Sequence, residues 1–152
     1  MNALRVVSSA LLGLLGGALA LEGMVLVPYW RSLRSDAFAG LHAGFAPRLY
    51  RFFAPLTAAA TSLALAAGIA VAWRPERGWA DWCTVASAVL AGSLLAFYWL
   101  YFHSANERLP VLAAAGDDPA LSAELGRWQR IHLARTFVSV AALVLALLGV
   151  SG

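Results

Sequence analysis

Four apolar stretches, each long enough to cross a lipid bilayer as a helix, account for nearly all of this 152-residue chain. The hydrocarbon core of a bilayer, about 30 Å thick, requires about 20 apolar residues in a helix. Hydrophobic residues make up 61% of the chain and charged residues only 12%, a composition outside the range of soluble globular proteins. We therefore predict an all-α fold, an integral membrane four-transmembrane-helix bundle.

Prolines, aromatic residues and charges mark where these stretches end. We expect a single membrane domain over residues 1–152, with spans at about 6–28, 47–73, 81–109 and 119–150. Pro28 and Pro110 are expected to end the first and third spans, because proline cannot donate a backbone hydrogen bond. A short amphipathic helix over 36–46 is expected between spans 1 and 2. Its apolar side carries Phe38, Leu41 and Phe45.

The beginning of the chain also resembles a secretory signal peptide, with Arg5, a leucine-rich stretch and an Ala-Leu-Ala triplet at 18–20. The apolar run continues beyond this triplet as far as Pro28, which gives it the length of a membrane span. This continuation favours the first of four spans over a cleaved signal.

The arginines are unevenly distributed between the two ends of such a bundle. Both termini and the 74–81 turn share one side with only Arg5, Arg74 and Arg77, whereas the other side carries eight arginines. The positive-inside rule then places the arginine-rich side in the cytoplasm and both termini outside. The use of arginine without any lysine, beside abundant alanine, is typical of GC-rich codon usage. We therefore expect a bacterial inner membrane location.

The sequence also indicates which partners to expect. No basic run and no interleaved basic and aromatic stripe is present, so nucleic acid is not expected as a partner. The lipid bilayer is the expected surrounding. Small residues at 13–20 and 58–68 offer surfaces for close helix packing, which makes a homo-oligomer a further expectation.

Polar residues gather at one end of the expected bundle. All three histidines, all four tyrosines and Glu22, a carboxylate inside an apolar stretch, fall on the same side. A carboxylate at that depth must face the bundle interior and be protonated, ion-paired or bound to a metal. Helical spacing places Trp128, His132, Arg135 and Ser139 on one stripe of the fourth helix, and Trp99, His103 and Asn106 on one stripe of the third.

Two interpretations of this cluster remain open. Glu22, His42, His103 and His132 form a candidate metal site, because imidazoles and a carboxylate suit iron, copper or zinc. No local ligand signature such as H-x-x-x-H supports it. In the alternative interpretation Glu22 pairs with Arg135 as a structural ion pair, and the aromatic residues form an ordinary interfacial belt.

A short motif in the fourth helix carries a family resemblance. The segment WQRIHLART begins at Trp128 and contains His132 and Arg135, and the segment NERL begins at Asn106. With the glycine-rich first span, this pattern resembles the anthrone-oxygenase-like family of small four-span membrane proteins. The similarity covers essentially the whole chain in layout, whereas the specific pattern is W-x3-H-x2-R with N-x2-L before it. Ser104 stands where the family pattern leads us to expect proline.

The resemblance implies oxidation of a small aromatic or phenolic substrate of anthrone type by dioxygen. It implies catalytic roles for His132 as general base, for Arg135 as the group that stabilises an enolate oxygen, and for Asn106. The reaction would use either iron or copper, or dioxygen alone without a cofactor. The aromatic residues expected to hold the planar substrate are Trp128, Trp99, Tyr98 and Tyr101.

Two other functions fit the same sequence. One is a noncatalytic membrane protein, either a small-solute carrier or an accessory subunit of a larger complex. The other is a haem-binding membrane protein with His103 and His132 as the axial ligands.

Overall fold

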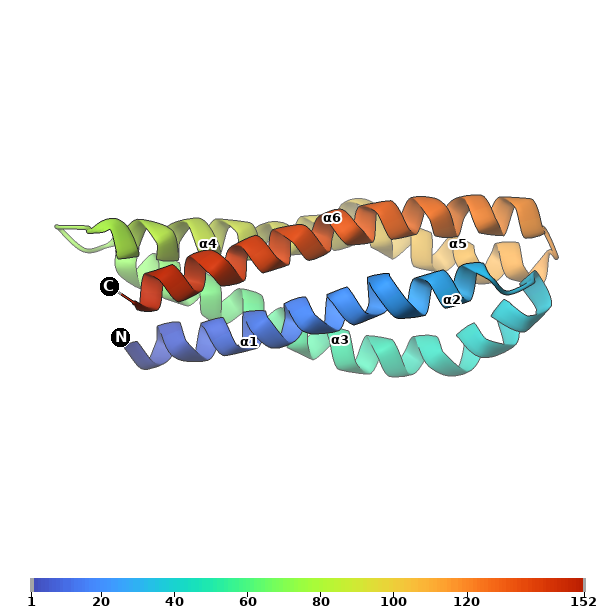
Figure 1. Cartoon of the computed structure of the whole chain (residues 1–152), viewed down its shortest axis with the longest axis horizontal. Coiled ribbons are helices and arrows are strands. Elements are labelled where there is room, and N and C mark those ends of the chain that lie inside the picture. The colour runs from blue at the N-terminus through green and yellow to red at the C-terminus, as the bar shows by residue number, and fades with distance from the viewer. Residues whose placement is uncertain (1, 152) are drawn as a thin grey trace.

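The computed structural model describes residues 2–151, and every regular element within them is helical (Figure 1). The segments are α1 (Asn2–Leu21), η1 (Glu22–Leu26), α2 (Val27–Arg31), α3 (Ser35–Ala72), α4 (Trp79–Phe97), η2 (Tyr98–Phe102), α5 (His103–Ala114) and α6 (Asp118–Val150). Consecutive segments join into four long helices, each long and apolar enough to cross a membrane. The predicted four-helix membrane bundle is confirmed.

The four long helices run antiparallel to their neighbours and form a closed ring. α1 packs against α6, α6 against α4, α4 against α3, and α3 against α1. Both termini lie at one end of the bundle with the α3–α4 connection, which we call the closed end (Figure 1). The α2–α3 and α5–α6 connections lie at the other, which we call the open end (Figure 1). This is the grouping of connections that the sequence predicts.

The second span differs from its prediction. The expected short helix over 36–46 is not a separate element, because α3 runs without interruption through both Pro47 and Pro55. No cluster of polar turn residues accompanies Pro47, so the helix continues through it at the cost of one backbone hydrogen bond. The amphipathic segment is therefore the start of a 38-residue helix.

The prolines of the first and third spans do not end their helices either. Pro28 lies in the first turn of α2, directly after the π-helical turn η1, and the helix continues to Arg31. A proline is well tolerated at the start of an α-helical segment, where its missing N–H needs no partner. Pro110 lies within α5, which continues to Ala114.

The two halves of the bundle have different cores. The core toward the closed end is built from leucine and alanine, and small residues let the helices approach closely. At Gly68, for example, an added methyl group would overlap the side chain of Ala88 on α4. The core of the open half is built mainly from larger side chains, among them Trp30, Phe38 and Phe102. Large side chains hold the helices further apart.

Candidate functional site

A cavity of about 510 Å³ lies in the open half, between the first part of α3 and the other helices. Its volume is within the range of sites that hold small organic ligands. Side chains at helical spacing along α3, from Phe38 to Ala58, form one wall. This part of α3 packs against α5, whereas α2 contacts it only weakly. The apolar face that the sequence predicts for 36–46 therefore covers a cavity.

Aromatic rings form much of the remaining wall. Tyr98 and Trp99 of η2 line the cavity together with Trp128 of α6, as the sequence predicts for substrate-binding residues. Tyr101 does not line it, because its hydroxyl instead donates a hydrogen bond to Glu124 at 3.3 Å. Flat rings on several sides suit a flat aromatic ligand.

Two buried charged groups share the cavity. Glu22 and Arg135 are 7% and 9% exposed, and both line it. They form no direct ion pair within residues 2–151, but the two charges attract each other through space, so the predicted structural pairing is found only in this weaker form. Arg135 also makes no hydrogen bond in this part of the chain, and its guanidinium carbon lies 5.2 Å from the centre of the Phe102 ring. Both groups are therefore available to a ligand.

His132 lies behind the cavity wall. It is fully buried and does not line the cavity, and its ring stacks on Trp128 at 4.7 Å between centroids. Its Nε2 lies 2.8 Å from the carbonyl oxygen of Leu19, which can only accept, so Nε2 carries the proton. The same nitrogen lies 3.8 Å from Oε2 of Glu22. A ligand in the cavity therefore meets Glu22 and Trp128 before it meets His132.

Asn106 and Trp128 are joined directly. Nε1 of Trp128 donates a hydrogen bond to Oδ1 of Asn106 at 3.0 Å, and both residues line the cavity. The structure thus brings together the stripes of the third and fourth helices that the sequence predicts.

The predicted metal ligands do not assemble into one site. His42 and His103 line the cavity, but His42 stacks on Phe38 and His103 stacks on Trp99. Within the described chain, no three side chains of histidine, cysteine, aspartate or glutamate form a group that could hold a metal ion. His42 and His103 line the cavity, whereas His132 lies behind Trp128, so the four predicted ligands do not face one space in the described chain.

The haem interpretation meets the same obstacle. His103 is half exposed and lies 3.9 Å from Glu107, whereas His132 is enclosed between Trp128 and the Leu19 carbonyl. The two imidazoles do not face a common space that a porphyrin could fill.

Two π-helical turns border the site, and sequence reasoning missed both. η1 begins at Glu22 and η2 begins at Tyr98. A π-turn inserts an extra residue and re-aims the side chains around it, and such turns are frequent at functional sites. The sequence offers one signal for η1, the glycine at position 23. A glycine is required there because an added methyl group would lie 2.8 Å from Cδ2 of His132.

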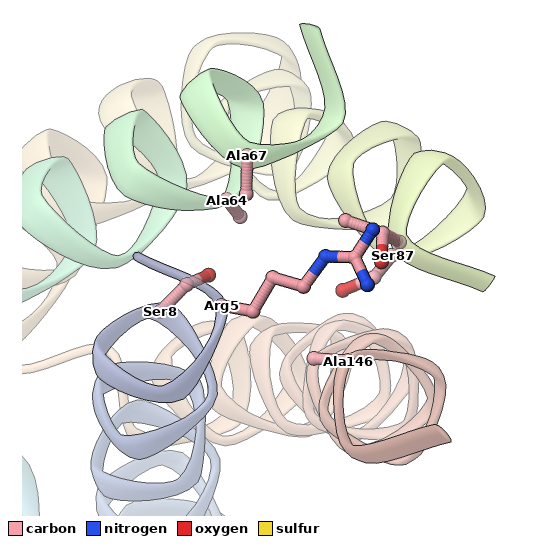
Figure 2. Close-up of a pocket in the computed structure, with 7 residues that line it drawn as sticks. Arg5, Ser8, Ala64, Ala67, Ser87 and Ala146 are labelled. Atoms are coloured by element: carbon pink, nitrogen blue, oxygen red, sulfur yellow. The ribbon is translucent and has the colours of Figure 1, made fainter. Parts of the chain in front are cut away.

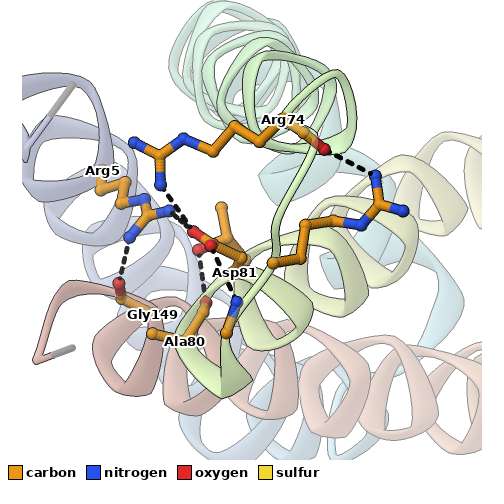
Figure 3. Close-up of polar contacts among 8 residues, drawn as sticks. Arg5, Arg74, Ala80, Asp81 and Gly149 are labelled. Carbon is orange, nitrogen blue, oxygen red and sulfur yellow. Dashed lines mark hydrogen bonds and ion pairs between the residues drawn. The ribbon is translucent and has the colours of Figure 1, made fainter.

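A second polar cluster, at the closed end, was also missed. Arg5 is 7% exposed and forms an ion pair with Asp81, which also accepts from Nη1 of Arg74 at 3.1 Å (Figure 3). The other terminal nitrogen of Arg5 donates to the carbonyl of Gly149 at 2.8 Å. Figure 2 shows Arg5 reaching between the helices beside a cavity of only about 10 Å³. That space holds roughly one water molecule, so this cluster fastens helices together.

Comparison with known proteins identifies a family for this chain. The model of the anthrone oxygenase family matches residues 47–145, a segment that contains Asn106, Trp128, His132 and Arg135. Glu22 and His42 precede that segment. No curated protein and no solved structure matches the chain. Because the family match extends over most of its length, the chain belongs to the anthrone oxygenase family.

Proposed function

We propose that the protein is a membrane-embedded oxygenase that oxidises a small, flat, anthrone-type substrate with dioxygen inside the cavity of the open half. One observation carries this proposal: an aromatic-lined cavity of about 510 Å³ contains a buried carboxylate and a buried guanidinium that lack direct ionic pairing with each other. Burying such groups without a direct partner is unfavourable, and ionisable residues inside a membrane bundle commonly mark a functional site.

The cavity fits a substrate that dissolves in the bilayer. Tyr50 and Trp99, both at its edge, are 63% and 69% exposed on the outer surface of the bundle. A fused-ring ligand could pass between them from the lipid phase and exchange contacts with lipid for contacts with aromatic side chains. Few polar groups would need to lose water on entry.

Glu22 is the group placed to start the reaction. The CH₂ carbon of an anthrone is acidified by the ketone and the two flanking rings, so a carboxylate can remove one proton. The electron pair of the broken C–H bond moves onto the ketone oxygen, where Arg135 donates hydrogen bonds to the enolate. Proton transfer to Glu22 and charge stabilisation by Arg135 thus occur in one cavity.

The enolate then reacts with dioxygen as the electron acceptor. A C–O bond forms at the former CH₂ carbon, which is oxidised by two electrons, and dioxygen is reduced to a hydroperoxide that takes the proton back from Glu22. Loss of the second C–H proton and cleavage of the O–O bond give the ketone and one molecule of water. One dioxygen converts one anthrone into one anthraquinone and one water.

His132 acts through Glu22 in this scheme. Its Nε2–H bonds to the Leu19 carbonyl and lies next to the Glu22 carboxylate, so it positions the turn that carries the base. In this proposal the general base is Glu22 and not His132, which the sequence predicts for that role. His132 instead positions Glu22.

Oxygen uptake by purified protein in detergent tests the proposal. Anthrone should be consumed with one dioxygen per anthraquinone formed, and ¹⁸O₂ should label the new ketone oxygen. Glu22→Gln should slow the reaction by about 10²- to 10⁴-fold, the usual contribution of a general base.

Glu76→Gln is the matched control, because Glu76 is an exposed acid in the α3–α4 connection at the closed end. This variant should react at the wild-type rate. Protein that binds anthrone but takes up no oxygen beyond the rate in empty micelles would overturn the oxygenase function. Unchanged turnover in Glu22→Gln would overturn the assignment of the base.

A further inference from the structure

Two exposed arginines at the open end meet over the buried Gly126, outside the cavity. Gly126 of α6 has no side chain, and a methyl group added there would lie 3.7 Å from Nη2 of Arg31 and 3.9 Å from Nη1 of Arg130. Arg31 ends α2, so the two guanidiniums come from different helices. Neither residue lines the cavity.

The position of Arg31 is held by protein contacts. Its Nη1 donates a hydrogen bond to Oε1 of Gln129 at 2.7 Å, and Nε2 of Gln129 donates to the carbonyl of Gly23 at 3.3 Å. Gln129 of α6 thus bridges Arg31 and Gly23, which both belong to the first long helix. Its second terminal nitrogen is left directed toward Gly126 and Arg130.

No acidic residue neutralises this pair. Within residues 2–151, neither Arg31 nor Arg130 forms an ion pair with a carboxylate. By contrast, Arg34 and Arg108 at the same end have Asp36 and Glu124 as partners. Two positive charges held near one point repel each other. An anion bound between them would replace this repulsion by two attractions.

The surroundings indicate which anion this spot would take. Arg31 directly follows Tyr29 and Trp30, and Tyr29 is 54% exposed. Aromatic residues of this kind mark the level of lipid headgroups. Guanidinium groups bind phosphate oxygens through paired hydrogen bonds. We infer that the exposed guanidinium groups of Arg31 and Arg130, which meet over the buried Gly126, form a site for a phosphate group, the headgroup of an anionic phospholipid.

Thermal unfolding of the delipidated protein in neutral detergent tests this site. Phosphatidylglycerol should raise the unfolding temperature in a saturable way, because a ligand that binds only the folded state stabilises it. Phosphatidylcholine should be less effective, since its choline cation is repelled by the two arginines. Inorganic phosphate in a third titration distinguishes a lipid headgroup from the free ion.

The variants should weaken the apparent affinity for phosphatidylglycerol by roughly fivefold for each arginine lost. Arg130→Gln is the cleaner variant, because Arg130 has no protein partner among residues 2–151 and its loss leaves the fold intact. Arg31→Gln combined with Arg130→Gln should give the larger loss. The matched control removes two other exposed arginines of the open end, Arg34→Gln with Arg48→Gln, and should keep the wild-type affinity.

An equal loss of affinity in the control pair would overturn the site, because net charge alone would then explain binding. Equal protection by phosphatidylcholine would do the same. If inorganic phosphate protects as well as phosphatidylglycerol and both effects vanish in Arg130→Gln, the phosphate site stands and the headgroup assignment is overturned.

Discussion

Arg5 at the closed end and Arg135 at the open end are both buried arginines inside a membrane bundle, but their surroundings are opposite. One terminal nitrogen of Arg5 forms an ion pair with Asp81, and the other donates a hydrogen bond to the carbonyl of Gly149 (Figure 3). Arg135 makes no hydrogen bond to the described protein and lines a large cavity. The terminal nitrogens of Arg5 thus have partners within the fold, whereas those of Arg135 have none among the described residues.

Packing explains why the two halves differ. Alanine, glycine and leucine bring the helices of the closed half together, so a charge there must find its partner within the protein. In the open half the core is built from aromatic side chains, and Glu22 and Arg135 both line the cavity beside them without a direct ion pair among the described residues. A buried charge thus has a structural role in one half and a proposed chemical role in the other.

Asp81→Asn should have the largest effect of the four substitutions, a loss of stability. The substitution leaves the buried guanidinium of Arg5 without a counter-charge, and removing one partner of such a pair is strongly destabilising. Thermal unfolding in detergent measures the loss. Turnover per folded molecule should stay at the wild-type level, because the cavity lies at the other end.

Glu76→Gln is the control for that variant, since it makes the same acid-to-amide change on an exposed residue of the neighbouring connection. It should shift stability by less than about 0.5 kcal/mol. If Asp81→Asn were as stable as Glu76→Gln, the closed end would not depend on its ion pair. The contrast between the two ends would then fail.

Arg135→Gln should have the next largest effect, a decrease in turnover. Loss of the group that stabilises the enolate oxygen should lower kcat by about 10²- to 10³-fold, or roughly 2.7 to 4 kcal/mol. Stability should hold or improve, because an unpaired buried charge is removed. Arg127→Gln, an exposed arginine on the same helix, is the control and should retain turnover. Unfolding of Arg135→Gln would show a structural arginine instead.

Gly23→Ala should affect both stability and turnover, by a smaller amount. The added methyl group would lie 2.8 Å from Cδ2 of His132, and overpacking of this kind costs about 1 to 3 kcal/mol. Because Gly23 follows Glu22 within η1, the shift should also displace the base and reduce turnover. Gly17→Ala is the control on the same first helix, where a methyl group would meet nothing within 4 Å. Equal behaviour of the two variants would show that His132 does not pack tightly on η1.

Helical periodicity was sufficient to predict that polar residues of the third and fourth helices gather at the open end. It placed Trp128 and Arg135 on one stripe of the fourth helix and Asn106 opposite them, and in the structure all three line one cavity. Antiparallel helices of similar length necessarily bring such stripes to the same level. Glu22 followed from its depth in the first span, because a carboxylate there must face inward.

Periodicity could not predict which neighbour each residue of the stripe meets. His132 belongs to the stripe, yet it faces Leu19 and Glu22 rather than the cavity. The π-turns lie in the helices that face α6: each rotates the rest of its own helix by about 100° relative to an uninterrupted α-helix, and no residue pattern marks either insertion. Periodicity could not predict the ion pair of Arg5 with Asp81 either, because 76 residues separate the two and they lie on different helices.

Trp128→Phe should have the smallest effect of the four. Phenylalanine keeps an aromatic ring against His132 but loses the hydrogen bond from Nε1 to Asn106, worth about 0.5 to 1.5 kcal/mol. Asn106 is exposed, so water can replace the lost donor and the cost should lie near the lower limit. Thermal unfolding beside Trp79→Phe, an exposed tryptophan at the closed end, measures it. A loss above about 3 kcal/mol would mean that this wall stabilises the fold, and the open end would then be structural like the closed one.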